Sequence, residues 1–187
     1  MSIETGALLW SLTGLTAAGL LLAAAGRLGR ARAAAWLVVL GLVMLSVEEP
    51  LLTLFWTLTG PEVDRDGMAS LITAPASAHV LDAAILATTF MVLLGWVAMT
   101  GLRRGEPWAT RILAVAWAVA AAGIALTAVT VYARGLPLPT PGGRAEGAGY
   151  GWEQLAVGLL AWASGLWLAR TGPAATPSPR HAPAERR

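Results

Sequence analysis

The chain contains five apolar stretches, each about as long as a helix that crosses a lipid bilayer. A crossing needs about 20 mostly apolar residues, because the hydrocarbon layer is about 30 Å thick and a helix rises about 1.5 Å per residue. The stretches are residues 5–26, 34–59, 78–102, 112–132 and 151–169. Hydrocarbon offers the backbone no hydrogen-bond partners, so such segments form helices. We therefore expect an all-α, polytopic membrane helix bundle with five transmembrane helices.

The composition agrees with this class and excludes several kinds of chemistry. Hydrophobic residues make up 56% of the chain and charged residues only 13%, which is too apolar for an ordinary soluble domain. Cys and Lys are both absent, which excludes disulfides, thiolate catalysis and lysine Schiff bases. The absence of Lys and Asn, with abundant Ala, Gly, Arg and Pro, is typical of a GC-rich bacterial genome. We expect a multi-pass protein of the bacterial cytoplasmic (inner or plasma) membrane.

The arginines predict the orientation and the domain boundaries. Residues 1–170 read as one bundle, and residues 171–187 as a disordered, Pro-containing and Arg-containing cytoplasmic tail. One set of connections, together with the tail, carries Arg27, Arg30, Arg32, Arg103, Arg104, Arg111, Arg170, Arg180, Arg186 and Arg187. The opposite connections carry only Arg65, Arg134 and Arg144. The positive-inside rule then places the N-terminus outside and the C-terminus in the cytoplasm. We attribute the net charge of +2 to these helix ends and predict no nucleic-acid partner.

Two adjacent acids, Glu48 and Glu49, interrupt the second apolar stretch and are followed by Pro50. Ionisable groups at membrane depth are costly and are functional-site candidates by default. At about 100° per residue the two side chains cannot share a helix face. Glu49 forms a polar stripe with Ser46 and Thr53, so it is the better candidate for the bundle interior. Pro50 lacks an N–H, which predicts a kink and an unpaired carbonyl at Ser46.

Further ionisable residues lie near the outer ends of other predicted spans. His79 and Asp82 occupy adjacent turns at the start of the third span, and Glu153 begins the fifth. The predicted site for a ligand or proton is therefore Glu49, Glu48, Asp82, His79, Ser46, Thr53 and Glu153. A metal site is not expected, since carboxylate bundle sites carry Glu-x-x-His motifs on two helices. No cofactor is predicted.

Three functions remain open on this pattern. In the first, a non-enzymatic membrane component uses an outward-facing carboxylate pocket to bind or relay a proton, a cation or a small amphipathic cation. In the second, a membrane-embedded enzyme acts on a lipid or isoprenoid, with one carboxylic acid as proton donor; its catalytic residues are unknown. In the third, the chain is a scaffold or assembly subunit. The partners predicted are the lipid bilayer, a small cationic or lipid-like ligand, and another membrane protein or a second copy. Glu48 and Glu49 can also serve structure alone, by hydrogen bonding to a neighbouring helix.

Small residues at helical spacing predict where helices approach closely. The pairs are Gly14 with Ala18, Ala116 with Ala120, and Gly158 with Gly165.

One turn has a clear physical interpretation. In Arg103-Arg104-Gly105-Glu106-Pro107-Trp108-Ala109 the arginines complement a helix C-terminus, Gly105 permits the chain to reverse and Pro107 suits the first turn of the next helix. With the His-x-x-Asp at His79, this stretch of residues 79–118 resembles small uncharacterised bacterial integral membrane proteins of four or five spans. The resemblance implies a membrane bundle and no particular activity.

Overall fold

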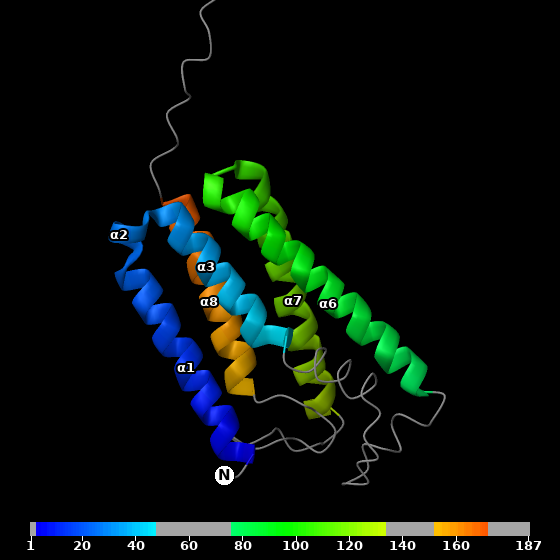
Figure 1. Ribbon diagram of the computed structural model, residues 1–187. Helices are drawn as coiled ribbons and strands as arrows, with labels where there is room; N and C mark the ends of the chain where they lie inside the picture. Colours follow the sequence, from blue (N-terminus) through cyan, green and yellow to red (C-terminus); the bar gives the residue numbers. More distant parts are fainter. Residues whose placement is uncertain (1–2, 48–75, 134–151, 172–187) are drawn as a thin grey trace, which may run out of the picture.

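The computed structural model describes residues 3–47, 76–133 and 152–171, and every regular element in these ranges is helical (Figure 1). The elements are α1 (Ile3–Ala23), α2 (Ala25–Leu28), α3 (Arg30–Leu42), the π-helix η1 (Val43–Val47), α6 (Ala76–Thr100), the 3-10 helix η2 (Leu102–Arg104), α7 (Pro107–Ala133) and α8 (Trp152–Arg170). The prediction of an all-α helical bundle is confirmed. Glu48, Glu49 and Thr53 lie outside the described residues, as does the predicted tail except Thr171.

Successive long helices run in opposite directions (Figure 1). The ends of α1, α6 and α8 lie with the beginnings of α3 and α7 at one end of the bundle, which is uppermost in the figure. The beginnings of α1, α6 and α8 lie toward the other end, with η1. The connections from α1 to α3 and from α6 to α7 are short, and short connections place consecutive helices antiparallel.

The core lies between α3 and α8, which share the most extensive contact of any two described elements. Glycines permit this approach, because an added Cβ at Gly41 would lie 2.7 Å from the carbonyl oxygen of Gly158. A Cβ at Gly165 would lie 2.7 Å from the carbonyl oxygen of Ala34. The predicted small-residue contacts at Gly158 and Gly165 are thus confirmed. Around this seam α1 packs against α8, and α6 packs against α3.

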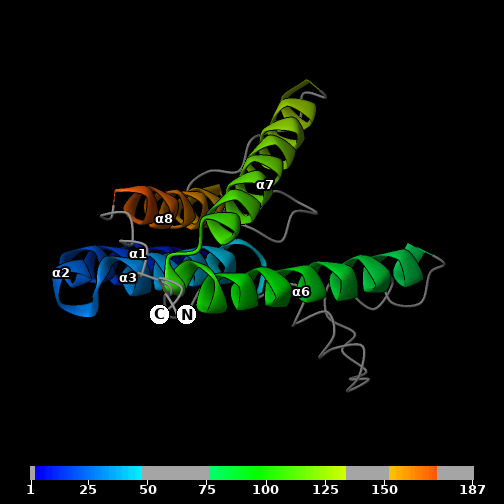
Figure 2. The ribbon, with the colours of Figure 1, turned by 90° about the horizontal axis from the view of Figure 1, so that it is seen from above.

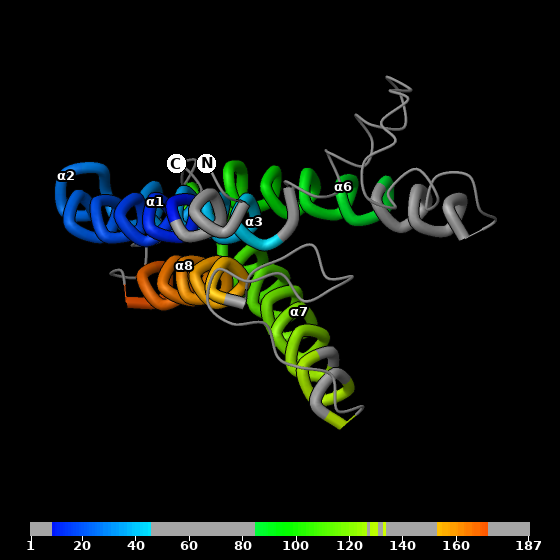
Figure 3. The backbone as a smooth tube through the Cα atoms, turned by 90° about the horizontal axis from the view of Figure 1, so that it is seen from below, coloured from blue at the N-terminus to red at the C-terminus, as the bar shows by residue number. Residues whose placement is uncertain are grey.

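Helices α6 and α7 diverge from the rest of the bundle (Figures 2 and 3). They are joined at η2, where Leu102 is fully buried, and they separate with increasing distance from it. The predicted turn is confirmed here, because Gly105 adopts a left-handed φ of 74° and α7 begins at Pro107. A left-handed backbone favours Gly because other residues meet their own Cβ there.

Two of the described helices are long and apolar enough to cross a membrane. They cover Ile85–Arg104 and Pro107–Thr130, and a shorter apolar helix covers Leu9–Ala23. The prediction of five spanning helices is therefore not supported by length and composition within the described ranges. The second stretch is described only as far as Val47, and α8 includes Glu153, Gln154 and Arg170 within its 19 residues.

Candidate functional site

The second apolar stretch changes its helix type immediately before the two glutamates. The α-helix α3 ends at Leu42 and continues as the π-helix η1 up to Val47, the residue that precedes Glu48. A π-helical turn carries one extra residue and is found frequently at functional sites. The sequence predicted a disturbance one turn before Pro50, and η1 lies at that position. The disturbance is a widened turn.

A side chain from another helix bonds to this turn. The amide Nε2 of Gln154, in the first turn of α8, donates a hydrogen bond of 3.0 Å to the carbonyl oxygen of Met44. Gln154 is 4% exposed and Met44 is 1% exposed, so the bond lies inside the protein. The predicted unpaired carbonyl was that of Ser46; the carbonyl that receives this bond belongs to Met44, two residues earlier.

The α3–α8 seam explains how Gln154 reaches η1. Gly158 lies one turn after Gln154 on α8, and an added Cβ there would lie 2.7 Å from the Cγ of Leu45. Without a side chain at Gly158, the two backbones come close enough for the amide to span them. Met44 also packs over α1, because a Cβ at Gly14 would meet its side chain at 2.7 Å. The turn before Glu48 is therefore held from two neighbouring helices.

The predicted site residues are only partly brought together. Ser46 lies on η1, and Glu153 lies beside Gln154 at the start of α8 and is half-buried. His79 and Asp82 lie in the first turns of α6, which diverge from α3 and α8 (Figures 1 and 2). Among the residues that the structure describes, no three of His, Asp and Glu form a group able to hold a metal ion.

Gln154 is the site residue that the sequence interpretation missed. Placing an ionised acid inside a membrane costs free energy, which makes acids stand out in an apolar stretch. An uncharged amide at the beginning of a predicted span does not stand out in this way. The available signal was position: Gln154 and Glu48 both lie at span positions on the side without the arginine-rich connections. Its partner is a backbone carbonyl 110 residues away in sequence, which no local pattern reveals.

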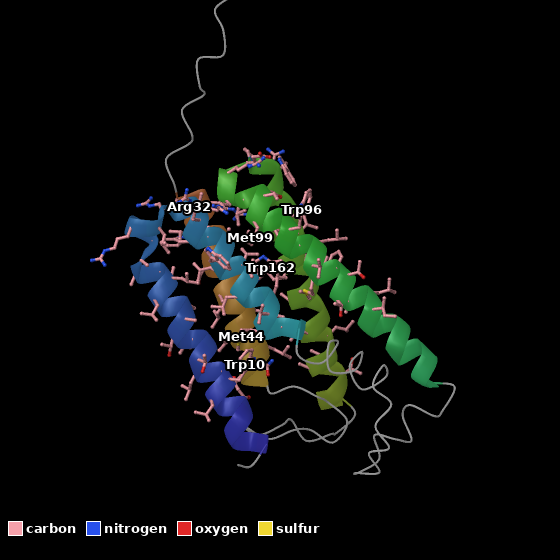
Figure 4. All side chains as sticks on the ribbon, viewed as in Figure 1. Trp10, Arg32, Met44, Trp96, Met99 and Trp162 are labelled. Atoms are coloured by element: carbon pink, nitrogen blue, oxygen red, sulfur yellow. The ribbon has the colours of Figure 1, made fainter. Side chains whose placement is uncertain are left out.

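The opposite end of the bundle carries a concentrated positive charge. Seven exposed arginines lie there, and we call them the arginine surface: Arg27, Arg30, Arg32, Arg103, Arg104, Arg111 and Arg170. Figure 4 labels Arg32 at this end and Met44 toward the other. Glu106, in the connection between η2 and α7, is the one acid among the described residues at this end, and its carboxylate accepts a hydrogen bond from the indole N–H of Trp108.

Four of the five exposed tryptophans among the described residues lie close to the arginine surface: Trp36, Trp96, Trp108 and Trp167, on α3, α6, α7 and α8 respectively, each between 43% and 63% exposed. Each of these four lies within two helical turns of an arginine of that surface. The fifth, Trp10 on α1, is 39% exposed and lies toward the other end (Figure 4). Trp96 is labelled in Figure 4. Two other tryptophans lie farther from the arginine surface: Trp117 on α7 is half-buried, and Trp162 on α8 is buried. The indole N–H of Trp117 donates a hydrogen bond to the carbonyl oxygen of Leu159.

No protein-family description, curated protein sequence or solved structure matches this chain.

Proposed function

We propose that the chain is an integral membrane protein whose helices cross the bilayer with the arginine surface in the cytoplasm. The observation that carries this proposal is that the two long apolar helices among the described residues are mostly exposed. Only 22% of the most apolar part of Ile85–Arg104 is buried, and only 6% of that of Pro107–Thr130. A core helix of a soluble protein would be covered by its neighbours, because exposed apolar surface is costly in water. Lipid chains remove that cost.

Charge and aromatic residues support the same placement. Basic residues concentrate on the cytoplasmic side of membrane proteins, and tryptophans concentrate at the boundary between headgroups and hydrocarbon. The arginine surface and the four exposed tryptophans beside it follow both rules. In the full arrangement that we propose, α1, the second stretch, α6, α7 and α8 each cross once, with the N-terminus outside.

The activity that we propose is non-enzymatic: an outward-facing carboxylate pocket binds or relays a proton, a cation or a small amphipathic cation. Glu49 is the principal acid in this proposal, with Glu48 and Glu153 nearby. It is supported by the π-helical turn that leads into Glu48 and by the buried bond from Gln154 to that turn. A widened turn with an interhelical donor gives the following residues a defined starting geometry at a site where ionisable groups are rare.

Infrared difference spectroscopy of the purified protein tests the pocket. We expect a carboxyl band that changes when pH is changed, or when sodium ions or tetraphenylphosphonium are added. Glu49→Gln should remove this band while leaving the amount of folded protein unchanged. Glu62→Gln, which removes an acid from a predicted loop, is the matched control and should retain it. Identical spectra from all three proteins would refute the carboxylate pocket.

A further inference from the structure

The charge of this protein is strongly separated along the bundle. Seven arginines and one acid among the described residues at one end give that end a formal charge of 7 − 1 = +6. The whole chain carries only +2, and the other charged residues that the structure describes, Glu4, Asp82 and Glu153, are all acids in the first turns of α1, α6 and α8. The net charge thus conceals an end with the charge density of an anion-binding surface.

The packing brings these arginines from four parts of the chain onto one surface. Leu102 is fully buried in the same cluster as Ala33 and Leu37, so η2, which carries Arg103 and Arg104, lies against the beginning of α3. The guanidinium of Arg30 donates a hydrogen bond of 2.7 Å to the carbonyl oxygen of Thr171, which joins the start of α3 to the end of α8. The short helix α2 adds Arg27 next to α3.

We propose that the arginine surface is a binding surface for anionic phospholipid headgroups. This inference rests on the membrane placement in the proposed function but not on the carboxylate pocket. The fork of donors on a guanidinium matches two oxygens of one phosphate, and Arg is weakly hydrated for a cation. Glu106 accepts a hydrogen bond from Trp108 and is a single acid among seven arginines. The arginine surface therefore keeps an excess of positive charge that bound phosphates can neutralise.

The four exposed tryptophans beside the arginine surface favour a lipid over a soluble anionic partner. A nucleic acid or an acidic protein would contact only the outer, charged part of this end. A phospholipid also presents a glycerol and ester layer next to its phosphate, and an indole ring suits that layer because it is apolar with one N–H donor. Trp36, Trp108 and Trp167 are exposed at that level beside the arginines, on three different helices.

Fluorescence quenching by brominated lipids tests this inference on the full chain. Purified protein is reconstituted in phosphatidylcholine vesicles that contain the same fraction of brominated phosphatidylglycerol or of brominated phosphatidylcholine. We expect stronger quenching of the tryptophans by the anionic lipid, and a preference that falls as salt is raised. Each arginine near an anionic surface contributes a factor of about five in binding, so R103Q/R104Q/R111Q should lower the preference at least about tenfold.

The matched control is R65Q/R134Q/R144Q, which removes three arginines from connections predicted to lie on the other side. It should keep the preference for phosphatidylglycerol. Equal quenching by the two lipids in the wild-type protein, or equal loss in both triple variants, would overturn the inference. If R103Q/R104Q/R111Q does not fold, the wild-type comparison at low and high salt still decides. Glu49→Gln should leave the lipid preference intact, so failure of the carboxylate pocket is distinguishable from failure of lipid binding.

Discussion

The hydrogen bond from Gln154 to Met44 is the described polar contact most closely linked to the candidate pocket. Both groups are buried, so removal of the Gln154 amide takes one hydrogen-bond partner from the Met44 carbonyl. A typical hydrogen bond contributes about 0.5–1.5 kcal/mol net to the stability of soluble proteins. Interhelical hydrogen bonds in membranes contribute about 0.6 kcal/mol on average. The bond therefore makes a modest contribution to stability, and its larger effect is on the geometry of the turn before Glu48.

Replacement of this amide should have a small and specific cost. We expect Gln154→Leu to lower the free energy of unfolding by about 1 kcal/mol, measured by denaturation of the purified protein with sodium dodecyl sulfate. Thr13→Val is the control, because the Thr13 hydroxyl bonds to the carbonyl of Leu9 in its own exposed helix, and its removal leaves no buried group unpaired. Equal changes in the two variants would contradict a special role for the interhelical bond.

The same substitution separates positioning from stability. If Gln154 sets the geometry of the turn that leads to the acids, Gln154→Leu should shift the infrared carboxyl band that Glu49→Gln removes. A variant that only destabilises the fold, such as Leu102→Ala at the opposite end of the bundle, should leave the position of that band unchanged in the protein that remains folded. An unshifted band in Gln154→Leu would restrict Gln154 to a packing role.

At the scale of elements, the α3–α8 seam contains glycines that cannot be replaced by a larger residue unless the two helices move apart. An added Cβ at Gly41 would lie 2.7 Å from the carbonyl oxygen of Gly158 and 2.8 Å from the backbone N of Trp162. Backbone atoms on a facing helix cannot rotate away, so a substitution there must push the helices apart. Gly95 on α6 is also helical, yet nothing lies within 4 Å of its added Cβ.

This contrast makes Gly41→Ala and Gly95→Ala a matched pair. We expect Gly41→Ala to lower the free energy of unfolding by about 1–3 kcal/mol through overpacking. Gly95→Ala should be neutral or slightly stabilising, because Ala favours the helix over Gly by up to about 1 kcal/mol. Thermal unfolding in detergent measures both. A destabilised Gly95→Ala with an unaffected Gly41→Ala would contradict the described seam.

The element η1 limits what a helical wheel predicts about the acids. The choice of Glu49 over Glu48 for the bundle interior assumed a regular α-helix through Ser46. A π-helical turn contains one extra residue, and an α-helix that continues after such a turn is rotated by about 100° relative to the α-helix before it. Pro50 predicted that the helix would be disturbed, but the kind of disturbance depends on which neighbour supplies hydrogen bonds. Here Gln154 supplies one.

At the scale of the whole molecule, the membrane orientation that we propose from the arginine surface and the exposed apolar helices can be measured. The chain contains no Cys, so single cysteines can be introduced without background. We expect Ser70→Cys and Thr140→Cys to react with a membrane-impermeant maleimide in intact cells. Ser178→Cys should react only after permeabilisation. Five crossings with the N-terminus outside require this pattern, and reaction of Ser178→Cys in intact cells would refute it.

Features of the fold that depend on residues close together in the sequence could be predicted, whereas features that depend on distant residues could not. The helical class, the turn at Gly105 and the close contacts at Gly158 and Gly165 were predictable because each depends on local chemistry: apolar length, a left-handed φ or the absence of a side chain. The boundaries shifted where polar residues join a helix, since α3 begins at Arg30 and α7 at Pro107. Of the candidate site, Ser46 and Glu153 are at the same end as η1, and the two central acids remain a prediction.

By itself the sequence determined the helical class and the positions of the arginines between the apolar runs, because long apolar runs form helices and the arginines stand in the connections between them. Only the tertiary structure decided which helices pack closely. It paired α3 with α8 and left α6 and α7 diverging. It also brought Gln154 to Met44 across 110 residues. Such contacts depend on the shapes of two surfaces meeting, and neither segment carries that information alone.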